Sequence, residues 1–588
     1  MSLLPPSEER KRFSVIRIVV AIFCVYFVFH LVDMQIINAQ AINEDNRSKR
    51  EITRVILAPR GSILDKDSNV LAKTVFKYDV NVAPIKVGPV EREVNGALVT
   101  LSVDQIATRL AEILGKDKDF ILRKMSGTGG YANLAKNVNS SVMTQVESFE
   151  LPWLWTDANV SRIYPNGAVA GNLLGFITAD GVTKAGIESK MDACLNGVNG
   201  KESFDQGSDG IRIPESAVVY KAAKNGGNLK LTIDTNLQYF SQQVLETAVK
   251  NERADYGTAI VIEVKTGRLL VAAEAPTVDP NNPGAAKERD RQTKIFTESF
   301  EPGSTMKMIT AASAIDTGVA SQTTRVVAPY RLKMSFGNGK NWVKDSVYHP
   351  TMKLTLTGIL RDSSNTGIIQ VGEDMDRTTR VSYLKKFGFG SKTSLNMSGE
   401  SGGILGDTKN WDLQTDKNSM FGQGVAVTSI QMAYAFQAIA NKGVRLSPKL
   451  FESCTSSNGG VTQYPVGEPV RAVSEQTARS TVEMLEKVVE EGHIGRTAAI
   501  AGYRVGGKTG TAQIKQGRTY GNLYAISFAG LAPADDPQYV VAVMLYKSRR
   551  TASSIGATPV FKQIMQQTLR AYRIPPSTTK SREIPSEW

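Results

Sequence analysis

Cysteine is scarce in this sequence, and the scarcity limits how the fold can be stabilised. The 588 residues hold only three cysteines, Cys24, Cys194 and Cys454. So few thiols in so long a chain exclude the disulfide framework that small secreted proteins use. A bridge between Cys194 and Cys454 is possible but not expected, because we assign the two residues to different domains.

Histidine is equally rare, and this excludes one class of metal chemistry. His30, His349 and His493 lie far apart in the chain and show no metal-ligand spacing. A zinc centre built from histidine and carboxylate ligands is therefore excluded. We expect neither a metal nor a cofactor, and other side chains must carry the chemistry.

The chain also lacks a basic stripe interleaved with aromatic residues. Its net charge is +13 and its pI about 9.3, but the basic residues are scattered, with short clusters only at 10–12 and 547–550. We therefore expect no nucleic-acid partner; a basic surface also suits an anionic membrane or cell wall. A length of 588 residues predicts several domains, and 41% hydrophobic with 22% charged residues predicts an ordered protein.

One long hydrophobic run is present, near the N-terminus. Residues 15–37 are mostly apolar, and Arg17 and Asp33 bracket a stretch without formal charge. Its length suits a membrane-spanning helix, and no small-residue cleavage site follows it, so we predict an uncleaved signal anchor. Because basic residues precede the run, residues 1–14 are expected in the cytoplasm and the rest of the chain outside.

The remainder divides by pattern into two regions and a tail. Residues 39–225 mix short strands, helices and turns, and we assign them to a non-catalytic module. Residues 226–574 predict a strand and helix over 228–249, a β-hairpin over 256–274, helices over 299–318 and 427–443, and three strands over 503–514, 523–534 and 539–546. Such an order predicts a multidomain α+β protein whose antiparallel sheet is covered by helices. Residues 575–588 are expected to be a mobile tail.

Three short motifs follow one another in the second region. They are Ser304-Thr305-Met306-Lys307, then Ser363-Ser364-Asn365, then Lys508-Thr509-Gly510. S-x-x-K with a later S-x-N and K-T-G is the motif set of penicillin-binding proteins and serine β-lactamases.

The first motif supplies a nucleophile and its base. A serine hydroxyl needs a base within hydrogen-bond reach, and residues i and i+3 of a helix lie on one face. Ser304 and Lys307 can therefore meet, and burial together with the cation of Lys508 would lower the lysine pKa. Ser304 also lies at a helix N-terminus, where its backbone N–H can form half of an oxyanion hole.

The other two motifs supply proton transfer and substrate binding. Ser363 offers a hydroxyl for proton relay to the leaving group, and Asn365 an amide that can hold a peptide. Lys508, Thr509, Gly510 and Thr511 on an edge strand would receive an extended substrate by strand addition. Gly510 permits close approach, and the two threonine hydroxyls can bind a terminal carboxylate.

The sequence contains second copies of all three motifs, and their contexts differ. Ser382–Lys385 lies within a predicted helix with no Pro-Gly turn before it. Lys265–Gly267 precedes the serine and forms the predicted hairpin turn. Ser456–Asn458 lies in a loop rich in serine and glycine. We interpret these three copies as structural.

At the selected motifs the chain resembles the class B penicillin-binding proteins. EPGSTMK (301–307), SSNTG (363–367) and GGKTGTAQ (506–513) are similar to the three family motifs, and GQGVAVTSIQMA (422–433) to a further family segment, with Ser429 where proline is usual. RGSILDKDSNVLA (60–72), RIYPNG with LLGF (162–176) and GIE (186–188) are similar to the family's pedestal module. Lys66, Asp67 and Ser68 depart from the usual residues there.

The resemblance implies a peptidoglycan D,D-transpeptidase that β-lactams inhibit. By that likeness Ser304 is the acylated nucleophile, Lys307 the general base, and the backbone of Thr511 completes the oxyanion hole with that of Ser304. The family attacks the penultimate D-Ala of a stem peptide, releases the last one and passes the acyl group to an amine. The 39–225 region resembles the class B pedestal and not a glycosyltransferase, so a polytopic membrane polymerase and other division proteins are expected partners, and the layout favours the septal type.

Two rival interpretations stay open on the sequence. A D,D-carboxypeptidase or β-lactamase would pass the acyl group to water, and Glu400, 35 residues after Asn365, invites the role of deacylating base. Its GESGG setting resembles the transpeptidases, however. A non-catalytic β-lactam sensor or division scaffold is the second rival. A sensor needs a cytoplasmic signalling domain, for which fourteen residues leave no room, and a scaffold would not need three intact motifs.

Overall fold

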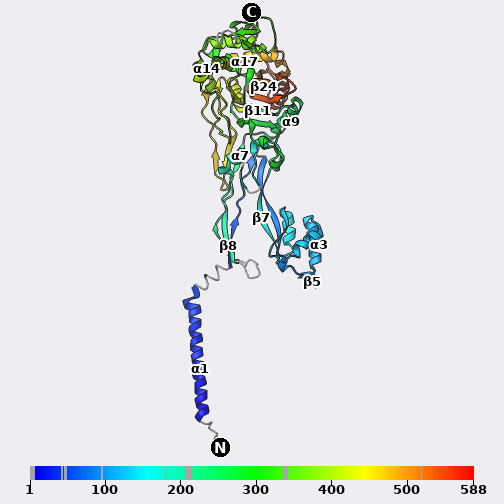
Figure 1. Ribbon diagram of the computed structural model, residues 1–588, viewed down its shortest axis with the longest axis vertical. Helices are drawn as coiled ribbons and strands as arrows, with labels where there is room; N and C mark the ends of the chain where they lie inside the picture. Colours follow the sequence, from blue (N-terminus) through cyan, green and yellow to red (C-terminus); the bar gives the residue numbers. More distant parts are fainter. Residues whose placement is uncertain are drawn as a thin grey trace. The chain divides into compact units, whose positions relative to one another are not determined.

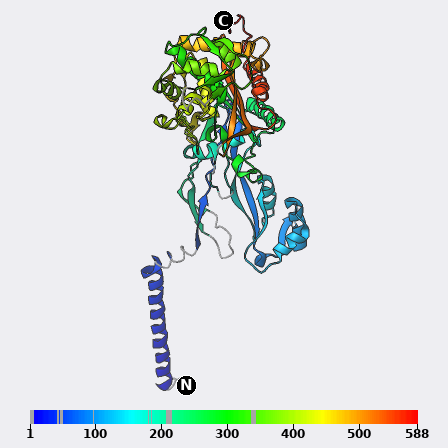
Figure 2. The same cartoon turned by 45° about the horizontal axis from the view of Figure 1, so that its top comes forward.

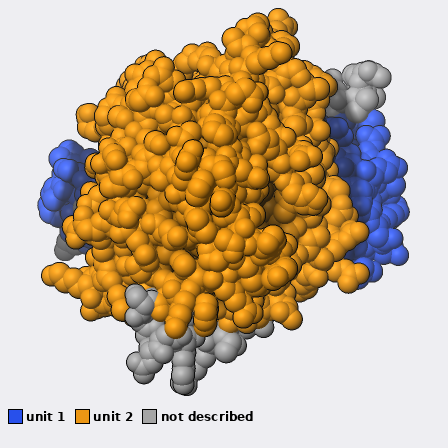
Figure 3. All heavy atoms as spheres, turned by 90° about the horizontal axis from the view of Figure 1, so that it is seen from above, with its two compact units in different colours: residues 1–59, 76–160, 197–225 blue, residues 60–75, 161–196, 226–588 orange. Residues whose placement is uncertain are grey.

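The computed structural model (Figure 1) describes residues 7–40, 44, 50–94, 97–178, 181–183, 185–205, 215–334, 342–517 and 519–588. Residues 1–6 of the predicted cytoplasmic tail lie outside this set. The chain forms two compact units, each built from separate stretches (Figure 3). The smaller holds residues 1–59, 76–160 and 197–225, and the larger holds 60–75, 161–196 and 226–588. The expected domain of 39–225 is thus divided, because 60–75 and 161–196 pack within the larger unit.

The N-terminal run is helical, as its composition predicts. Helix α1 spans Ser7–Val32 and a π-helical turn spans Asp33–Ile37. Residues 12–37 are long and apolar enough to cross a membrane, and none of this window is buried inside the protein. An exposed apolar helix of this length has no core to pack into, so a bilayer is its natural surrounding.

The smaller unit has its own hydrophobic core between helices and strands. Helices α3, α4 and α5 pack on strands β3 and β6 around Val80, Leu110 and Trp153. A separate antiparallel sheet has the order β1-β8-β9, and β4 pairs with β5. The bounds are β1 Glu51–Ile56, β3 Val70–Val82, β4 Val90–Val94, β5 Ala97–Leu101, α3 Val103–Leu114, α4 Lys118–Met125, β6 Ala132–Val138, α5 Ser140–Glu147, β7 Leu154–Ile163, β8 Gly200–Asp205 and β9 Val218–Lys221.

The larger unit is built around a five-stranded antiparallel sheet with helices on both faces (Figure 2). Its order is β12-β11-β25-β24-β23, so β23 is an edge strand. Alternate residues of β11 enter different cores: Ala259 and Val261 belong to the core that includes residues of α9 and α18, whereas Ile260 and Ile262 belong to the core that includes residues of α11 and α16. Burial on both faces explains why these strands are continuous apolar runs.

The elements predicted for this unit are present at nearly the predicted positions. They are β10 Asn228–Leu231, α9 Thr235–Glu252, β11 Tyr256–Glu263, β12 Leu269–Ala275, α11 Lys307–Asp316, α16 Ser429–Ala440, β23 Gly506–Gln516, β24 Thr519–Ala532 and β25 Tyr539–Ser548. The others, for which no range was predicted, are α10 Lys294–Thr297, β13 Ser299–Phe300, β18 Val427–Thr428, β2 Ile63–Leu64, α6 Gly171–Leu174, α7 Gly186–Lys190, α8 Asp192–Leu195, β14 Arg325–Ala328, β15 Arg331–Lys333, β16 Trp342–Lys344, β17 Met352–Thr355, α12 Leu356–Asp362, α13 Asn365–Glu373, α14 Arg377–Lys386, α15 Leu413–Asn418, β19 Val444–Arg445, β20 Phe451–Thr455, β21 Val461–Gln463, β22 Val470–Arg471, α17 Glu475–Glu490 and α18 Thr558–Ala571.

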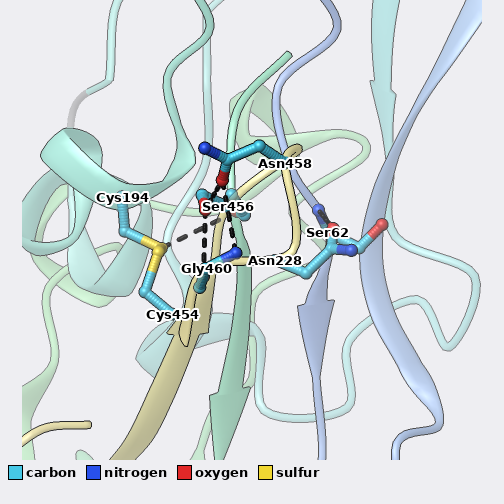
Figure 4. The surroundings of a disulfide bond; sticks show 8 residues. Ser62, Cys194, Asn228, Cys454, Ser456, Asn458 and Gly460 are labelled. Carbon is cyan, nitrogen blue, oxygen red and sulfur yellow. Dashed lines mark hydrogen bonds between the residues drawn. A yellow bond between two sulfur atoms is a disulfide. The ribbon is translucent and has the colours of Figure 1, made fainter. Parts of the chain in front are cut away.

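A disulfide joins Cys194 to Cys454, contrary to expectation (Figure 4). The prediction failed because it placed the two residues in different domains, whereas both flank strand β10. Leu229 of β10 is in register with Cys454 of β20, and the N–H of Gly227 donates to the carbonyl of Cys194 at 2.8 Å. A Cβ on Gly227 would lie 2.7 Å from Cys454 Sγ, so glycine is required for this approach.

The last residues are packed, so the prediction of a mobile tail over 575–588 is wrong. Ile584 is buried, and the carbonyl of Ser586 accepts the N–H of Thr355 at 3.1 Å. The indole N–H of Trp588 donates to the carbonyl of Leu354 at 3.1 Å. Composition alone does not reveal the contacts that these residues make with β17 and the start of α12.

Candidate active site

Ser304 lies in a 3-10 turn that leads into helix α11. The turn spans Gly303–Met306 and α11 begins at Lys307, so the predicted α-helix starts later than expected. In a 3-10 turn the side chains at i and i+3 eclipse each other. Lys307 Nζ accordingly lies 3.1 Å from Ser304 Oγ. Ser304 is partly exposed and Lys307 is fully buried, the arrangement of a reachable hydroxyl with a base behind it.

Three glycines allow the serine turn to pack against its neighbours. Gly303 has a φ of +56°, and a Cβ there would lie 2.6 Å from the carbonyl oxygen of Thr511. A Cβ on Gly422 would lie 2.1 Å from the carbonyl oxygen of Gly303, and one on Gly510 would lie 2.8 Å from Thr305 Cγ2. Backbone therefore meets backbone on both sides of the turn, which brings β23 next to Ser304.

Ser363 stands between the two motif lysines. It ends helix α12 with a φ of +60°, a left-handed conformation that costs a non-glycine residue roughly 1–3 kcal/mol. Its Oγ accepts from Lys307 Nζ at 3.2 Å and from Lys508 Nζ at 3.0 Å, and its carbonyl also accepts from Lys307. Lys307 and Lys508 each donate a hydrogen bond to the Ser363 hydroxyl oxygen and so use both of its lone pairs. The hydroxyl proton stays free to be donated to another group.

The third motif lies on the edge strand, as predicted. Lys508 is fully buried on β23, and its Nζ also donates to Thr509 Oγ1 at 3.0 Å. Thr511 Oγ1 lies 3.2 Å from Ser554 Oγ, and Ser554 donates to the carbonyl of Gly510 at 2.7 Å. Because β23 pairs with β24 on one side only, an extended peptide can add to its other edge.

Burial changes the acid–base behaviour of both lysines. It lowers the pKa of Lys307 to about 7, while the negative charge of Asp345 acts in the opposite direction. The pKa of Lys508 is also far below its usual range, first through burial and then through repulsion by Lys307. Of the two causes expected from the sequence, burial is the one that lowers the pKa of Lys307. Near neutral pH a neutral amine is available to accept the proton of Ser304.

Asn365 has contacts other than those expected. It is the first residue of α13, and its Nδ2 donates to the carbonyl of Lys344 at 2.9 Å. Within the described part of the chain, the hydrogen bonds that join Ser304, Lys307, Ser363 and Lys508 do not include the Asn365 amide.

Two residues of this region were missed on the sequence. Asp345 is buried and accepts the N–H of Thr366 at 3.0 Å and the hydroxyl of Ser364 at 2.7 Å, directly behind the second motif. Ser554 lies against the third motif. Neither belongs to a periodic pattern or a recognisable motif, so only the three-dimensional contacts identify them.

Comparison with known proteins identifies the family of the chain. Residues 257–566, more than half of the chain, match the family profile described as penicillin binding protein transpeptidase domain. The chain belongs to the penicillin-binding proteins. Residues 55–231 match a second profile, penicillin-binding protein dimerisation domain, which fits the class B arrangement of pedestal and transpeptidase.

Relatives and solved structures of penicillin-binding proteins align with nearly the whole chain. Penicillin-binding protein PbpB of Mycolicibacterium smegmatis is 32% identical over 570 residues, which cover 92% of this chain and 87% of that protein. Peptidoglycan D,D-transpeptidase FtsI of Escherichia coli is 29% identical, covering 92% and 89%. A peptidoglycan synthetase of Bifidobacterium adolescentis superposes with a TM-score of 0.73 at 29% identity, covering 92% of this chain and all of that one. Penicillin-binding protein 3 of Mycobacterium tuberculosis, solved with ampicillin, gives 0.70 at 28%, covering 91% and 100%.

The second copies of the motifs lie in structural positions of this penicillin-binding protein. Ser382 and Lys385 lie within helix α14. Gly267 has a φ of +69° in the β11–β12 turn, and Ser456 bonds to Asn458 within the turn between β20 and β21. Glu400 is buried, and its two carboxylate oxygens accept the N–H groups of Thr393 and Met397 at 2.7 Å each. A carboxylate that holds its own loop in this way is a structural one.

The pedestal motifs converge on one buried carboxylate in the larger unit. Arg60 Nε and Arg162 Nε each lie 2.7 Å from Glu188, and Arg60 Nη1 lies 2.5 Å from Asp192. Tyr164 donates to Glu188 at 3.2 Å. The first motif supplies Arg60, the second Arg162 and Tyr164, and the third Glu188. This network gives the three motifs a common structural role.

Proposed function

We propose that this chain is a peptidoglycan D,D-transpeptidase that acts by serine acyl transfer at Ser304. The observation that carries the proposal is the approach of the Lys307 amine to within 3.1 Å of the Ser304 hydroxyl. Neutral Lys307 takes the hydroxyl proton as Oγ attacks the penultimate D-Ala carbonyl of a stem peptide. The backbone N–H groups of Ser304 and Thr511 hold the resulting oxyanion.

The remaining residues complete the first half-reaction. The C–N bond to the terminal D-Ala breaks, and Ser363 passes a proton from the lysine pair to the departing amine. Lys508, Thr509 and Thr511 bind the terminal carboxylate, and Gly510 lets the peptide lie along the edge of β23. Asn365 exchanges its bond to Lys344 for one to the peptide. An amine of a neighbouring strand then attacks the acyl group, and Ser304 regains its proton.

Transfer to an amine is favoured over hydrolysis by the state of Glu400. A deacylating base must present a lone pair to a water molecule next to the ester. Both oxygens of Glu400 instead accept backbone N–H groups of its own loop. β-Lactams, which mimic the terminal D-Ala-D-Ala, are accordingly expected to acylate Ser304 and to leave slowly.

We also propose that the transpeptidase lies outside the cytoplasm, held by α1 in the bilayer with its N-terminus inside. Basic residues before the apolar run support this orientation. The Cys194–Cys454 disulfide supports it independently, because disulfides persist in oxidising compartments. Cell-wall cross-linking at the division septum, with a polytopic membrane polymerase and other division proteins as partners, follows from the likeness to the FtsI-type relatives.

The site of acylation can be located directly. Purified protein is incubated with penicillin, digested, and the adduct mapped by mass spectrometry. We expect the adduct on Ser304 and its complete loss in Ser304→Ala. Ser382→Ala, which removes the serine of the second S-x-x-K copy, is the matched control and keeps the adduct. A modified residue other than Ser304 would overturn the proposal.

The orientation has a separate test. A reporter enzyme that folds only outside the cytoplasm is fused after Trp588. Activity of the fusion in intact cells supports the proposed orientation, whereas activity of a cytoplasmic reporter at the same position would contradict it.

A further inference from the structure

Asp345 is a buried carboxylate that belongs to none of the three motifs. It follows strand β16, and its N–H donates to the carbonyl of Tyr330 at 3.0 Å. Only 5% of its surface is exposed. Burial of an ionised group is costly unless its charge and hydrogen bonds are balanced, so its contacts must account for its position.

The carboxylate of Asp345 is bound to the first turn of helix α13. One oxygen accepts the N–H groups of Asn365 and Thr366, and the other accepts the Ser364 hydroxyl at 2.7 Å. A carboxylate at a helix N-terminus is favoured by the free N–H groups and by the helix dipole. Here the carboxylate comes from a distant segment, so it fixes the Ser363–Asn365 turn from outside.

His349 is a further hydrogen-bond partner of Asp345. Its Nε2 lies 2.9 Å from Asp345 Oδ2, and its Nδ1 lies 2.7 Å from the carbonyl of Pro350. Both partners can only accept hydrogen bonds, so a ring N–H of His349 can hold the Asp345 carboxylate in place next to the second motif.

The same carboxylate acts on the charge of the lysine pair. Lys307 and Lys508 are both fully buried and both donate to Ser363 Oγ. The negative charge of Asp345 favours the ammonium form of Lys307, and that of Asp362 the ammonium form of Lys508. Among the described residues, the charged and titratable groups around the Ser363 turn include these two lysines, Asp345, Asp362, His349 and Arg361, which pairs with Asp362.

We propose that Asp345, held by His349, is a positioning residue that fixes the Ser363–Asn365 turn beside Ser304 and balances the charge of Lys307. This inference rests on the proposed function. It assigns Asp345 no contact with substrate: the carboxylate acts through the turn and through the lysine.

The test is the pH dependence of acylation by a chromogenic β-lactam. In Asp345→Asn we expect the second-order rate constant at pH 7.5 to fall at least tenfold because the turn loses its charged partner. We also expect the acid limb of the profile to move to lower pH, because loss of the negative charge favours neutral Lys307. In His349→Gln, which removes the ring that holds Asp345, we expect the same rate constant to fall, but by less than in Asp345→Asn.

Two controls separate this proposal from general instability and from the proposed function. Asp376→Asn changes another carboxylate that caps a helix, α14, through Thr379, and it should leave the profile unchanged. His349 is at the edge of the network, so His349→Gln remains informative if Asp345→Asn fails to fold. If the wild type is acylated at Ser304 and neither the acid limb in Asp345→Asn nor the rate constant in either variant changes, the role of Asp345 is refuted while the proposed function stands. If the wild type is not acylated, the proposed function itself fails.

Discussion

Two clusters of buried charge in the larger unit differ in how their charges are balanced. At the pedestal motifs, Arg60 and Arg162 enclose Glu188, and Asp192 pairs with Arg60, so cations and anions match. At the proposed active site, Lys307 and Lys508 both bond to Ser363 Oγ, and no carboxylate forms an ion pair with either among the described residues. The first cluster is suited to hold segments together. The second is suited to give up and take protons, because burial makes its ammonium form unfavourable.

Replacing the base should give the largest effect on activity. Lys307→Met keeps the shape of the side chain and removes the amine, so the acylation rate should fall about 10³-fold. The folded-state pKa of Lys307, about 7, lies below that of an unfolded lysine. Its cost to stability is therefore complete below pH 7 and fades as the pH rises towards the unfolded value. Acylation kinetics and thermal unfolding at pH 6.5 measure both, and we expect a higher melting temperature.

A lower melting temperature with unchanged acylation would contradict this account of Lys307. Lys385→Met, which alters the lysine of the second S-x-x-K copy in α14, is the matched control and should change neither quantity appreciably.

Removing a charge from the cluster around Glu188 should lower the stability and leave the acylation rate nearly unchanged. Glu188→Gln leaves two largely buried arginine side chains without their central anion, and we expect a loss of about 3–5 kcal/mol of unfolding free energy. Folded protein should still be acylated by penicillin at nearly the normal rate. Chemical denaturation measures the first effect, with Glu246→Gln as control, because the partly exposed Glu246 and Lys250 form a pair that contributes little. A loss below 1 kcal/mol would show that the network does not stabilise this segment.

Removing the disulfide tests whether the segment that carries Glu188 and Asp192 is also held covalently. Cys454→Ser should lower the stability by about 2–4 kcal/mol. Reductant should bring the wild type to the stability of the variant, and Cys24→Ser, which removes the exposed free cysteine, should have no effect. Equal stability of oxidised wild type and Cys454→Ser would contradict the assigned pairing.

Removal of the C-terminal segment 584–588 should give the smallest effect of the four. These residues contact β17 and α12, and α12 ends at Ser363, so the deletion should lower stability by about 1–2 kcal/mol and acylation a few-fold. Denaturation and acylation assays measure both, and Lys580→Ala, an exposed change just before the segment, should alter neither. Unchanged values in the deletion would mean that the packed tail does not support the Ser363 turn.

Much of the catalytic unit could be predicted because its signals are local. Each of these signals lies within a few consecutive residues. They are the Pro302-Gly303 turn before Ser304, the three β-rich segments and the N-cap at Thr428. The order of the motifs then selected Ser304, Lys307, Ser363 and Lys508, which the structure brings together.

The features that escaped prediction depend on contacts between distant segments. Cys194 and Cys454 are 260 residues apart and meet because both flank β10. Asp345 precedes β17 and α12 in the chain and still binds the second motif, and the Trp588 indole binds the carbonyl of Leu354 in β17. Neither periodicity nor turn chemistry encodes such pairings, so the sequence alone could not give them.

The pH dependence of wild-type acylation by a chromogenic β-lactam tests the central claim most directly. If buried Lys307 is the base for Ser304, the second-order rate constant should fall on the acid side with a midpoint near pH 7. A rate that keeps rising up to pH 10, as an ordinary lysine base would require, or one that does not depend on pH between 5 and 9, would contradict it.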